Sequence, residues 1–474
     1  MMNMNKNKIP EYVQTIHLIA VCGTGMGALA CMLRDLGFAV TGSDQKIYPP
    51  MSDFLRQKGI KMHDGFRAQN FAAQPDLVIV GNAVSKDNPE VREMHRRGLH
   101  YCSMPQALNR FVAAGKQTLL VSGTHGKTTT SSILAWILFE AGCDPSFMIG
   151  GILKNFDSNY RLGRGPYFVV EGDEYDTAFF DKGPKFQHYE PYRAVLTSVE
   201  FDHADIFRDL DHVKTIFNNF VADLPGSCKL LAYDGEQNVT DVIDHHRCCI
   251  ERYGRKTTST WRLGAVSTQP PWTLFEVFKN HQSFGTFKTK LFGEHNLLNV
   301  LADIAVADDL NIPVDTIDRA LKTFEGIKRR QEIRGRKNGI TVMDDFAHHP
   351  TAVRETVRSV RAAVSGGRLI AVFEPRTNTS MRSVFQKDYT EVFDAADIIC
   401  IPKPPLLQKI PVGQRFSSEH LVQELKSRGK DAHYFPDTQT ILEFLSSTAR
   451  PGDMVLIMSN GGFDNIHQRL LDSL

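Results

Sequence analysis

The sequence predicts an α/β protein of three domains, each a mainly parallel sheet with covering helices. Apolar, β-prone runs alternate with helical patterns along the chain, which is typical of parallel sheets. Several of these runs end directly in glycine-rich or acidic loops, at the edge where such sheets bind their ligands. The length of 474 residues also exceeds what one core supports, because domains commonly hold about 100–200 residues.

The first series of elements predicts a Rossmann-like domain over residues 1–112. Strands are expected at 16–21, 38–44 and 76–80, and a helix is expected from the first glycine loop to about residue 36. That loop almost fits the dinucleotide pattern, and Asp44 follows about 20 residues on, where a ribose partner would lie. A diphosphate is therefore expected at this helix start; a nicotinamide dinucleotide and plain strand–helix packing are the alternatives. The candidate contacts are Gly23, Thr24, Gly25, Met26, Gly27, Ser43 and Asp44.

A second glycine loop opens the central domain, which we place at 113–327. The apolar run 119–122 ends in Gly123-Thr124-His125-Gly126-Lys127-Thr128-Thr129, and a helical run follows. This order predicts a phosphate cradle in which Lys127 reaches the β/γ-phosphates and the Thr128 hydroxyl binds Mg²⁺. Val121 stands where the common form of the loop has a glycine. The pattern predicts nucleoside-triphosphate binding, and the alternative is a glycine-rich turn with a surface lysine.

Acidic side chains follow the next two expected strands, at 167–171 and 194–199. Glu171 is best placed to meet Mg²⁺ held by the phosphate loop, because it lies at the carboxyl end of its strand and Mg²⁺ prefers oxygen ligands. Glu174 and Asp176 fit a solvated acidic turn better. His203 follows the second strand and is expected to ligate a second metal ion or to orient an acid, with a surface histidine as the alternative.

The segment 245–290 predicts hairpins inserted in the central domain. Its paired histidines and paired cysteines, at 245–246 and 248–249, match no familiar metal spacing, so we expect them to be structural. A helix is expected to begin near Asn296. Asn296 and Asn299 then share one face of the helix start and can pair with an adenine edge, while helix capping by Asn296 is the simpler alternative.

Strands near 340–343, 368–373 and 454–458 predict a Rossmann-like C-terminal domain over 328–474. The first of these ends in a cluster of titratable groups, Asp344 to His349. The second is followed by Arg376 and Arg382, which are candidate carboxylate clamps because a guanidinium pairs with a carboxylate bidentately. The alternative for both is an ordinary surface arginine.

Composition narrows the class of protein. Lys and Arg total 55 and Asp and Glu total 54, so a nucleic-acid partner has no electrostatic support. No run approaches the roughly 20 apolar residues of a membrane span, and residues 1–10 contain no apolar signal core. The eight cysteines show no disulfide-framework spacing. These features predict a cytoplasmic protein without a membrane partner.

The order of the loops resembles the Mur ligase family, the ATP-dependent amide-forming ligases of bacterial cell-wall precursor assembly. Five motifs carry the resemblance over nearly the whole chain: 23–27, 123–130, 200–205, 293–299 and 344–350. The last motif and the first glycine loop are similar to the branch that adds L-alanine to UDP-N-acetylmuramate. Residues 171–182, 373–379 and 459–467 are instead similar to a recycling branch, which joins UDP-N-acetylmuramate to the tripeptide L-alanyl-γ-D-glutamyl-meso-diaminopimelate.

The resemblance implies a role for each matched residue. Lys127 would bind the phosphates of ATP, Thr128 and Glu171 would hold one Mg²⁺, and His203 would serve a second metal position. The glycine loop at 23–27 would hold the uridine diphosphate, which argues against a nicotinamide cofactor. His295 and Asn299 would meet the adenine, with Arg330 and Asp345 reaching the nucleotide from the third domain. Arg376, Asn378 and Arg382 are the candidates for the peptide, and no lysine lies in clear register with the carbamylated lysine of several relatives, so the role of Lys214 stays open.

The implied reaction activates a carboxylate, since a muramate carboxylate is a poor acyl donor. ATP would phosphorylate it, and the free amine of the peptide would attack the resulting acyl phosphate. His348, His349 and Asp345 are candidate bases for that amine. We expect a monomer or weak oligomer, with closure of the third domain over the nucleotide. The alternatives are L-alanine addition, a nicotinamide-dependent dehydrogenase and a non-catalytic nucleotide switch.

Overall fold

The computed structural model describes residues 6–47, 49, 51–364 and 366–474. Contacts divide the chain into two compact units. The first comprises Met1–Val199, Asp211–Trp261 and Ala302–Ala320, and the second comprises Glu200–Leu210, Arg262–Leu301 and Leu321–Leu474. Within the described ranges, no helix is both long enough and apolar enough to cross a lipid bilayer.

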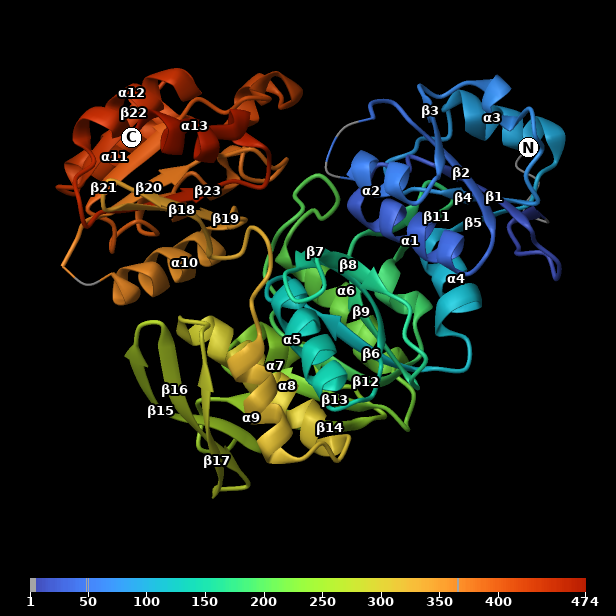
Figure 1. The fold of residues 1–474 in the computed structure, drawn as a ribbon, viewed down its shortest axis with the longest axis horizontal. Coiled ribbons are helices and arrows are strands. Elements are labelled where there is room, and N and C mark those ends of the chain that lie inside the picture. Colours follow the sequence, from blue (N-terminus) through green and yellow to red (C-terminus); the bar gives the residue numbers. More distant parts are fainter. Residues whose placement is uncertain (1–5, 48, 50, 365) are drawn as a thin grey trace. The chain divides into compact units, whose positions relative to one another are not determined.

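The N-terminal sheet is wholly parallel, with the strand order β3-β2-β1-β4-β5 (Figure 1). The strand at 77–80 is fully apolar, and its Ile79 and Val80 are completely buried, as expected for a sheet covered by helices on both faces. The elements are β1 (Thr15–Ile19), α1 (Thr24–Asp35), β2 (Ala39–Asp44), α2 (Met51–Gln57), β3 (Lys61–Asp64), β4 (Leu77–Val80), α3 (Pro89–Arg97), β5 (Tyr101–Ser103) and α4 (Met104–Leu108).

The central sheet of the first unit has the order β14-β13-β12-β6-β9-β7-β8. Its strands pair in parallel except for the β7–β8 hairpin. The strands are β6 (Gln117–Ser122), β7 (Ser146–Leu153), β8 (Ser158–Arg161), β9 (Tyr167–Gly172), β12 (Pro191–Leu196), β13 (Lys229–Tyr233) and β14 (Cys249–Gly254). The helices are α5 (Lys127–Glu140), α6 (Leu210–Asp223) and α7 (Gln237–Val242).

A short hairpin, β10 (Asp176–Ala178) and β11 (Asp181–Pro184), follows β9 directly. The two residues at its tip contact the core of the N-terminal sheet. The ring of Phe180 packs edge-on against Tyr101 with centroids 5.0 Å apart, and Phe179 meets His95 at 6.4 Å. Aromatic pairs prefer this edge-to-face arrangement. The hairpin therefore joins the segment after β9 to the N-terminal sheet.

The predicted hairpin region is only partly a hairpin. β16 (Trp272–Lys279) and β17 (Gln282–Thr289) pair antiparallel, and β15 (Trp261–Gln269) lies beside β16. The prediction was wrong for β14, because this strand pairs in parallel with β13 and continues the parallel sheet. The helices α8 (Glu294–Asp309) and α9 (Val314–Thr323) follow.

The C-terminal sheet has the order β18-β19-β23-β20-β21-β22, parallel except for the edge strand β18. Its strands are β18 (Glu332–Lys337), β19 (Ile340–Asp345), β20 (Leu369–Phe373), β21 (Ile398–Pro402), β22 (Asp431–Phe435) and β23 (Met454–Met458). Its helices are α10 (Pro350–Ala363), α11 (Ser418–Ser427), α12 (Thr438–Thr448) and α13 (Ile466–Ser473). Apolar clusters lie on both faces of this sheet. The predicted α/β class with mainly parallel sheets is confirmed.

Candidate active site

The second glycine loop joins β6 to α5 as the sequence predicts. Gly126 caps α5 with a φ of +82°, and Gly123 has a φ of +130°. A Cβ atom on Gly123 would lie 2.2 Å from Thr197 Oγ1 and 2.8 Å from the Ser198 backbone nitrogen. Both the positive φ and the close approach therefore require glycine at this position. The loop leads directly into the start of α5, and a helix N-terminus of this kind favours an anion.

The end of β12 holds this loop in place. The Ser198 hydroxyl accepts a 2.8 Å hydrogen bond from the His125 N–H, and the Ser198 carbonyl accepts one of 3.1 Å from the Thr124 N–H. The Thr197 hydroxyl donates to the Ser122 carbonyl at 3.1 Å. Thr197 and Ser198 were not among the site residues predicted from the sequence. Their position directly after an apolar strand, beside the motif at 200–205, was the only signal.

Lys127 lies at the start of α5 and is nearly enclosed. Its ammonium donates to the Gly123 carbonyl at 2.6 Å and to the Glu174 carboxylate at 2.8 Å. Burial disfavours the charged form, but Glu174, Asp173 and Glu171 raise the pKa of Lys127 above its usual value. The expectation of a solvated turn was wrong for Glu174, whose side chain is only 2% exposed. Asp176 instead pairs with Lys182 in a more exposed position.

Thr128, in the first turn of α5, meets Glu171 near the end of β9, the neighbour of β6 in the sheet. The Thr128 hydroxyl donates to Glu171 at 3.2 Å, and the Gly150 N–H donates to the other oxygen of Glu171 at 2.6 Å. Burial and the nearby Asp173 raise the pKa of Glu171. A hydroxyl and a carboxylate side by side are oxygen ligands of the kind that Mg²⁺ prefers. Thr129, the next residue of the loop, is 9% exposed on α5.

The first glycine loop also lies between a strand and a helix. Gly23 precedes α1, and the Gly27 N–H donates to the Gly23 carbonyl at 2.7 Å. A Cβ atom on Gly27 would lie 2.2 Å from Met51 Sδ, so a larger residue there would displace the Met51 side chain. The Asp44 carboxylate accepts a 2.9 Å hydrogen bond from the Cys22 N–H and so supports the loop. Of the other predicted contacts, Thr24 and Gly25 open α1 and Met26 is buried.

Ser43 is fully buried beside this loop. Its hydroxyl donates a 2.5 Å hydrogen bond to the carboxylate of Glu90, which lies on α3. The same carboxylate accepts from Asn70 and from the Arg67 N–H at 3.3 Å. Although burial raises it, hydrogen bonds from His17, Ser43 and Asn70 bring the pKa of Glu90 below its usual value. Glu90 was not among the site residues predicted from the sequence.

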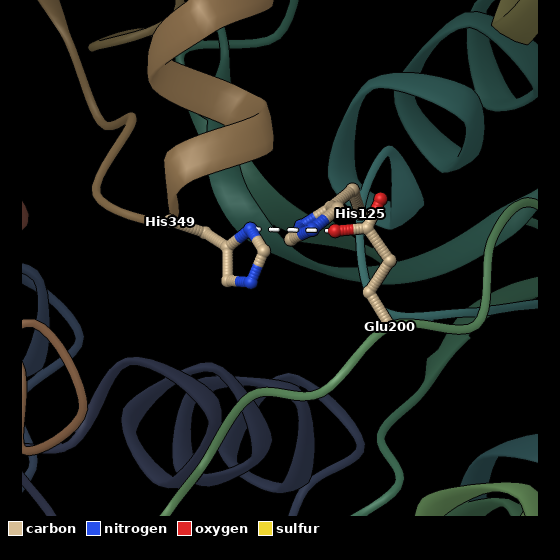
Figure 2. A group of neighbouring side chains, drawn as sticks. All are labelled: His125, Glu200 and His349. Carbon is tan, nitrogen blue, oxygen red and sulfur yellow. Dashed lines mark ion pairs between the residues drawn. The ribbon is translucent and has the colours of Figure 1, made fainter. Parts of the chain in front are cut away.

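In the second unit, the motif at 200–205 contacts the start of α10. Figure 2 shows the ion pair between His349 Nδ1 and Glu200, which lie 3.5 Å apart. His349 Nε2 lies 3.0 Å from the Phe201 carbonyl, and the Thr351 hydroxyl donates to Glu200 at 2.7 Å. The third side chain drawn, His125, belongs to the first unit, where its N–H contacts Ser198.

The predicted metal ligand His203 adopts a φ of +52°. It lies between Asp202, whose carboxylate is 3.7 Å from His348 Nε2, and the Ala204 N–H, which donates to the Thr379 hydroxyl at 3.2 Å. Asn378, a predicted peptide contact, donates to Asp205 at 3.0 Å. The structure thus brings His203, His348 and Asn378 to one region of the second unit.

The predicted nucleotide contacts of the second unit cluster around Asp345. This buried carboxylate accepts from the Gln331 N–H and the Ala347 N–H, each at 2.8 Å, and burial raises its pKa. Arg330 lies over the Phe346 ring at 5.1 Å.

On α8, the ring of His295 contacts the Ser359 hydroxyl at 3.4 Å, and burial lowers the pKa of His295 to about 4. Asn299 is 8% exposed one turn further on. Asn296 does not occupy the N-cap position of the capping alternative, because α8 begins at Glu294; its side-chain amide donates to the Phe292 carbonyl at 2.9 Å and to Gln331 at 3.2 Å.

The two predicted carboxylate clamps have different surroundings. Arg376 lies after β20, 3.4 Å from Glu374, and is about one-third exposed. A Cβ atom on Gly461 would lie 2.2 Å from its Nε. Arg382 instead donates to Gln414 and forms an isolated backbone bridge with Arg415. Lys214, whose role was left open, forms a 2.7 Å ion pair with Asp241.

Comparison with known proteins decides the family. A model of the Mur ligase family catalytic domain matches residues 15–116, the Mur ligase middle domain matches 121–307, and the Mur ligase glutamate ligase domain matches 329–461. The chain belongs to the Mur ligase family.

Full-length relatives of this Mur ligase family member come from several bacteria. It is 40% identical to the UDP-N-acetylmuramate–L-alanyl-γ-D-glutamyl-meso-2,6-diaminoheptandioate ligase of Escherichia coli over 97% of this chain and 98% of that one. It is 31% identical to the UDP-N-acetylmuramate–L-alanine ligase of Acetivibrio thermocellus, over 98% of this chain and 96% of that one. The crystal structure of a murein peptide ligase from Psychrobacter arcticus matches with a TM-score of 0.72 and 35% identity, covering 97% and 98% of the two chains.

Proposed function

We propose that this protein is an ATP-dependent ligase that joins UDP-N-acetylmuramate to the tripeptide L-alanyl-γ-D-glutamyl-meso-diaminopimelate in peptidoglycan recycling. The names of relatives at 40% and 37% identity supply the substrates, and those named for L-alanine are more distant, at 31–32%. One structural observation carries the proposal. Lys127 and Thr128 at the start of α5 lie beside Glu171 near the end of β9, next to a loop of the kind that cradles phosphate.

The residues of the phosphate loop fit MgATP. Gly123 and Gly126 both have positive φ, the backbone conformation that glycine-rich phosphate loops use to turn N–H groups toward an anion. Thr128 and Glu171 would hold one Mg²⁺, and His203 would serve a second metal position. Bound Mg²⁺ supplies neutralisation of phosphate charge. His295, Asn299, Arg330 and Asp345 are proposed to contact the nucleotide.

The proposed reaction proceeds in two steps. A carboxylate oxygen of the muramate attacks the γ-phosphorus of ATP, which forms an acyl phosphate and releases ADP. Lys127 neutralises the charge that develops on the phosphates. The amine of the peptide then attacks the acyl carbon, an amide bond forms, and inorganic phosphate leaves.

The amine must lose a proton in the second step, and Asp345 and His348 are the proposed acceptors. His348 Nε2 lies 3.7 Å from the Asp202 carboxylate. Asp345 is held by two backbone N–H groups, and its raised pKa brings it closer to the range of a working base.

The remaining assignments follow the same scheme. Residues 1–112, 113–327 and 328–474 are proposed as the UDP-sugar, ATP and peptide domains. The loop at 23–27 with Ser43 and Asp44 would hold the UDP-sugar, and Arg376, Asn378 and Arg382 would contact the peptide. We place the enzyme in the cytoplasm as a monomer or weak oligomer.

An ADP-release assay tests the function. UDP-N-acetylmuramate, ATP and Mg²⁺ are held constant, and L-alanine, the L-alanyl-γ-D-glutamyl dipeptide or the tripeptide is added in turn. We expect turnover with the tripeptide to exceed turnover with L-alanine. Turnover with L-alanine alone would assign the enzyme to the L-alanine-adding branch, and ATP hydrolysis indifferent to UDP-N-acetylmuramate would point to a nucleotide switch.

A further inference from the structure

Glu174 has no place in the reaction as derived, although it touches the lysine of the phosphate loop. We infer that Glu174 is a positioning residue that fixes the direction of the Lys127 ammonium for the phosphates of ATP. The inference rests on the proposed function, because it assigns Lys127 to the triphosphate. It stands on the geometry of Lys127, Gly123 and Glu174, and on how the neighbouring acid is neutralised.

Hydrogen bonds set the orientation of the Lys127 ammonium. A lysine ammonium has three N–H donors and turns freely about its last bond. Two of the three are engaged by the described residues, with the Gly123 carbonyl at 2.6 Å and Glu174 at 2.8 Å. These two contacts fix the rotation of the ammonium. The third N–H is then left in a defined direction for a phosphate oxygen.

The neighbouring acid, Asp173, has a lysine partner of its own. Asp173 is next to Glu174 in the chain and would compete for Lys127. It pairs with Lys185 at 2.7 Å instead, and the Lys185 ammonium also lies 4.1 Å from the centre of the Tyr175 ring. Each acid thus has its own lysine, and Glu174 is the carboxylate in direct contact with Lys127.

The pair formed by Glu174 and Lys127 is shielded from water. The side chain of Glu174 is 2% exposed and that of Lys127 is 12% exposed, so water screens the pair only weakly. A charge-assisted hydrogen bond in such surroundings is stronger and more directional than one at the surface. Glu174 is therefore able to hold Lys127 in one orientation before the nucleotide binds, which lowers the reorganisation needed during phosphoryl transfer.

The test compares Glu174→Gln and Glu174→Ala in the full-length enzyme. Glutamine keeps the shape and an acceptor oxygen but loses the charge, whereas alanine loses both. We expect the glutamine variant to retain more activity than the alanine variant, and kcat to fall by roughly 10- to 100-fold with alanine, the range of a lost hydrogen bond to a charged group. The KM for ATP should change less than kcat, because the contact matters most when charge shifts in the transition state.

A matched control comes from the same segment. Asp176 forms a 2.7 Å ion pair with Lys182, two residues beyond Glu174, but in a more exposed position. Asp176→Asn should leave kcat and KM unchanged, because exposed ion pairs contribute little. Thermal unfolding of all variants detects any general loss of structure.

A binding cycle separates positioning from a structural role without relying on turnover. The affinity for a non-hydrolysable ATP analogue with Mg²⁺ is measured by calorimetry for the wild type, Glu174→Gln, Lys127→Met and the double variant. We expect Glu174→Gln to weaken binding only about 3-fold in the wild type, less than the fall in kcat, and to leave binding unchanged when Lys127 is already replaced, since coupled residues are not additive.

Two results would overturn the inference. An equal loss in both backgrounds means that Glu174 acts on the fold and not on Lys127. Tighter analogue binding by Glu174→Gln means that the carboxylate competes with phosphate for the ammonium. Failure of the proposed function looks different, because a wild-type enzyme that binds the analogue but releases no ADP with any acceptor leaves the binding cycle intact.

Discussion

The Ser43 hydroxyl donates a 2.5 Å hydrogen bond to the buried carboxylate of Glu90, which links the end of β2 to α3. The Glu90 carboxylate also accepts hydrogen bonds from the Asn70 side chain and from the Arg67 N–H. One side chain therefore connects three segments beside the first glycine loop. We expect Glu90→Ala to destabilise the protein by about 1–3 kcal/mol, because it leaves buried hydrogen-bond donors without their acceptor. Chemical denaturation measures this loss, and an unchanged midpoint would contradict it.

The same carboxyl gives a pH prediction. The folded-state pKa of Glu90 lies below its usual value, so its contribution to stability is present above the unfolded pKa and is lost as the pH falls through the folded pKa. The stability difference between wild type and Glu90→Gln should therefore be largest near pH 7 and shrink below about pH 4. Urea denaturation at a series of pH values tests this, and a difference independent of pH would count against it.

Gly123→Ala should abolish nucleotide binding and destabilise the central sheet. The new Cβ would lie 2.2 Å from Thr197 Oγ1 and 2.8 Å from the Ser198 nitrogen, at a φ of +130°. We expect the free energy of unfolding to fall by about 2 kcal/mol or more. Gly142→Ala is the matched control, because Gly142 also has a positive φ but nothing lies within 4 Å of its Cβ position. It should cost only about 1 kcal/mol and leave ATP affinity unchanged.

Asp303→Asn should stabilise the protein at neutral pH. Asp303 is completely buried on α8, and neither of its carboxyl oxygens has a hydrogen-bond partner among the described residues. Burial raises its pKa well above the usual value, so its contribution to stability is lost as the pH rises from about 4 toward the folded pKa. Thermal unfolding should show that Asp303→Asn raises the free energy of unfolding over that of the wild type by about 1–3 kcal/mol at pH 8 and by less at pH 5. Equal gains at both values would disprove the ionisation argument.

Arg376→Ala should weaken peptide use selectively. Arg376 is partly exposed, and its contact with Glu374 is long at 3.4 Å, which leaves its guanidinium able to pair with a substrate carboxylate. We expect the KM for the tripeptide to rise about 10- to 100-fold while the KM for ATP stays constant. Arg376→Lys should recover little, because lysine lacks the planar fork. Steady-state kinetics with the tripeptide varied will show whether both KM values move together, the outcome that would rule out this role.

Local signals predicted the strands and the phosphate loop well. The positions of Gly123, Gly126 and Lys127 follow from backbone requirements that neighbouring residues reveal. Burial of polar side chains was not readable in the same way. Glu174 stands in a run of acids that suggests a solvated turn, yet Lys127, 47 positions away, determines its surroundings.

Long-range pairing explains the other misses. Glu90 follows an Asn-Pro helix start, and nothing in that local pattern shows that its side chain turns toward Ser43. The register of β14 against β13 depends on residues 20 positions apart, so a turn-rich segment was interpreted as a hairpin. Sequence patterns report backbone preference within a few residues, whereas these contacts depend on how separate elements pack.

The packing of Phe179 and Phe180 on His95 and Tyr101 limits how this enzyme can be recombined with its relatives. A chimera that exchanges residues 1–112 alone would place a foreign surface under the tip of the β10–β11 hairpin. The acids at the end of β9 lie only a few residues before that tip. A poor fit at the tip would therefore displace Glu174, the carboxylate that contacts Lys127. The exchangeable module is therefore discontinuous in sequence, and includes residues 176–184 together with the N-terminal sheet.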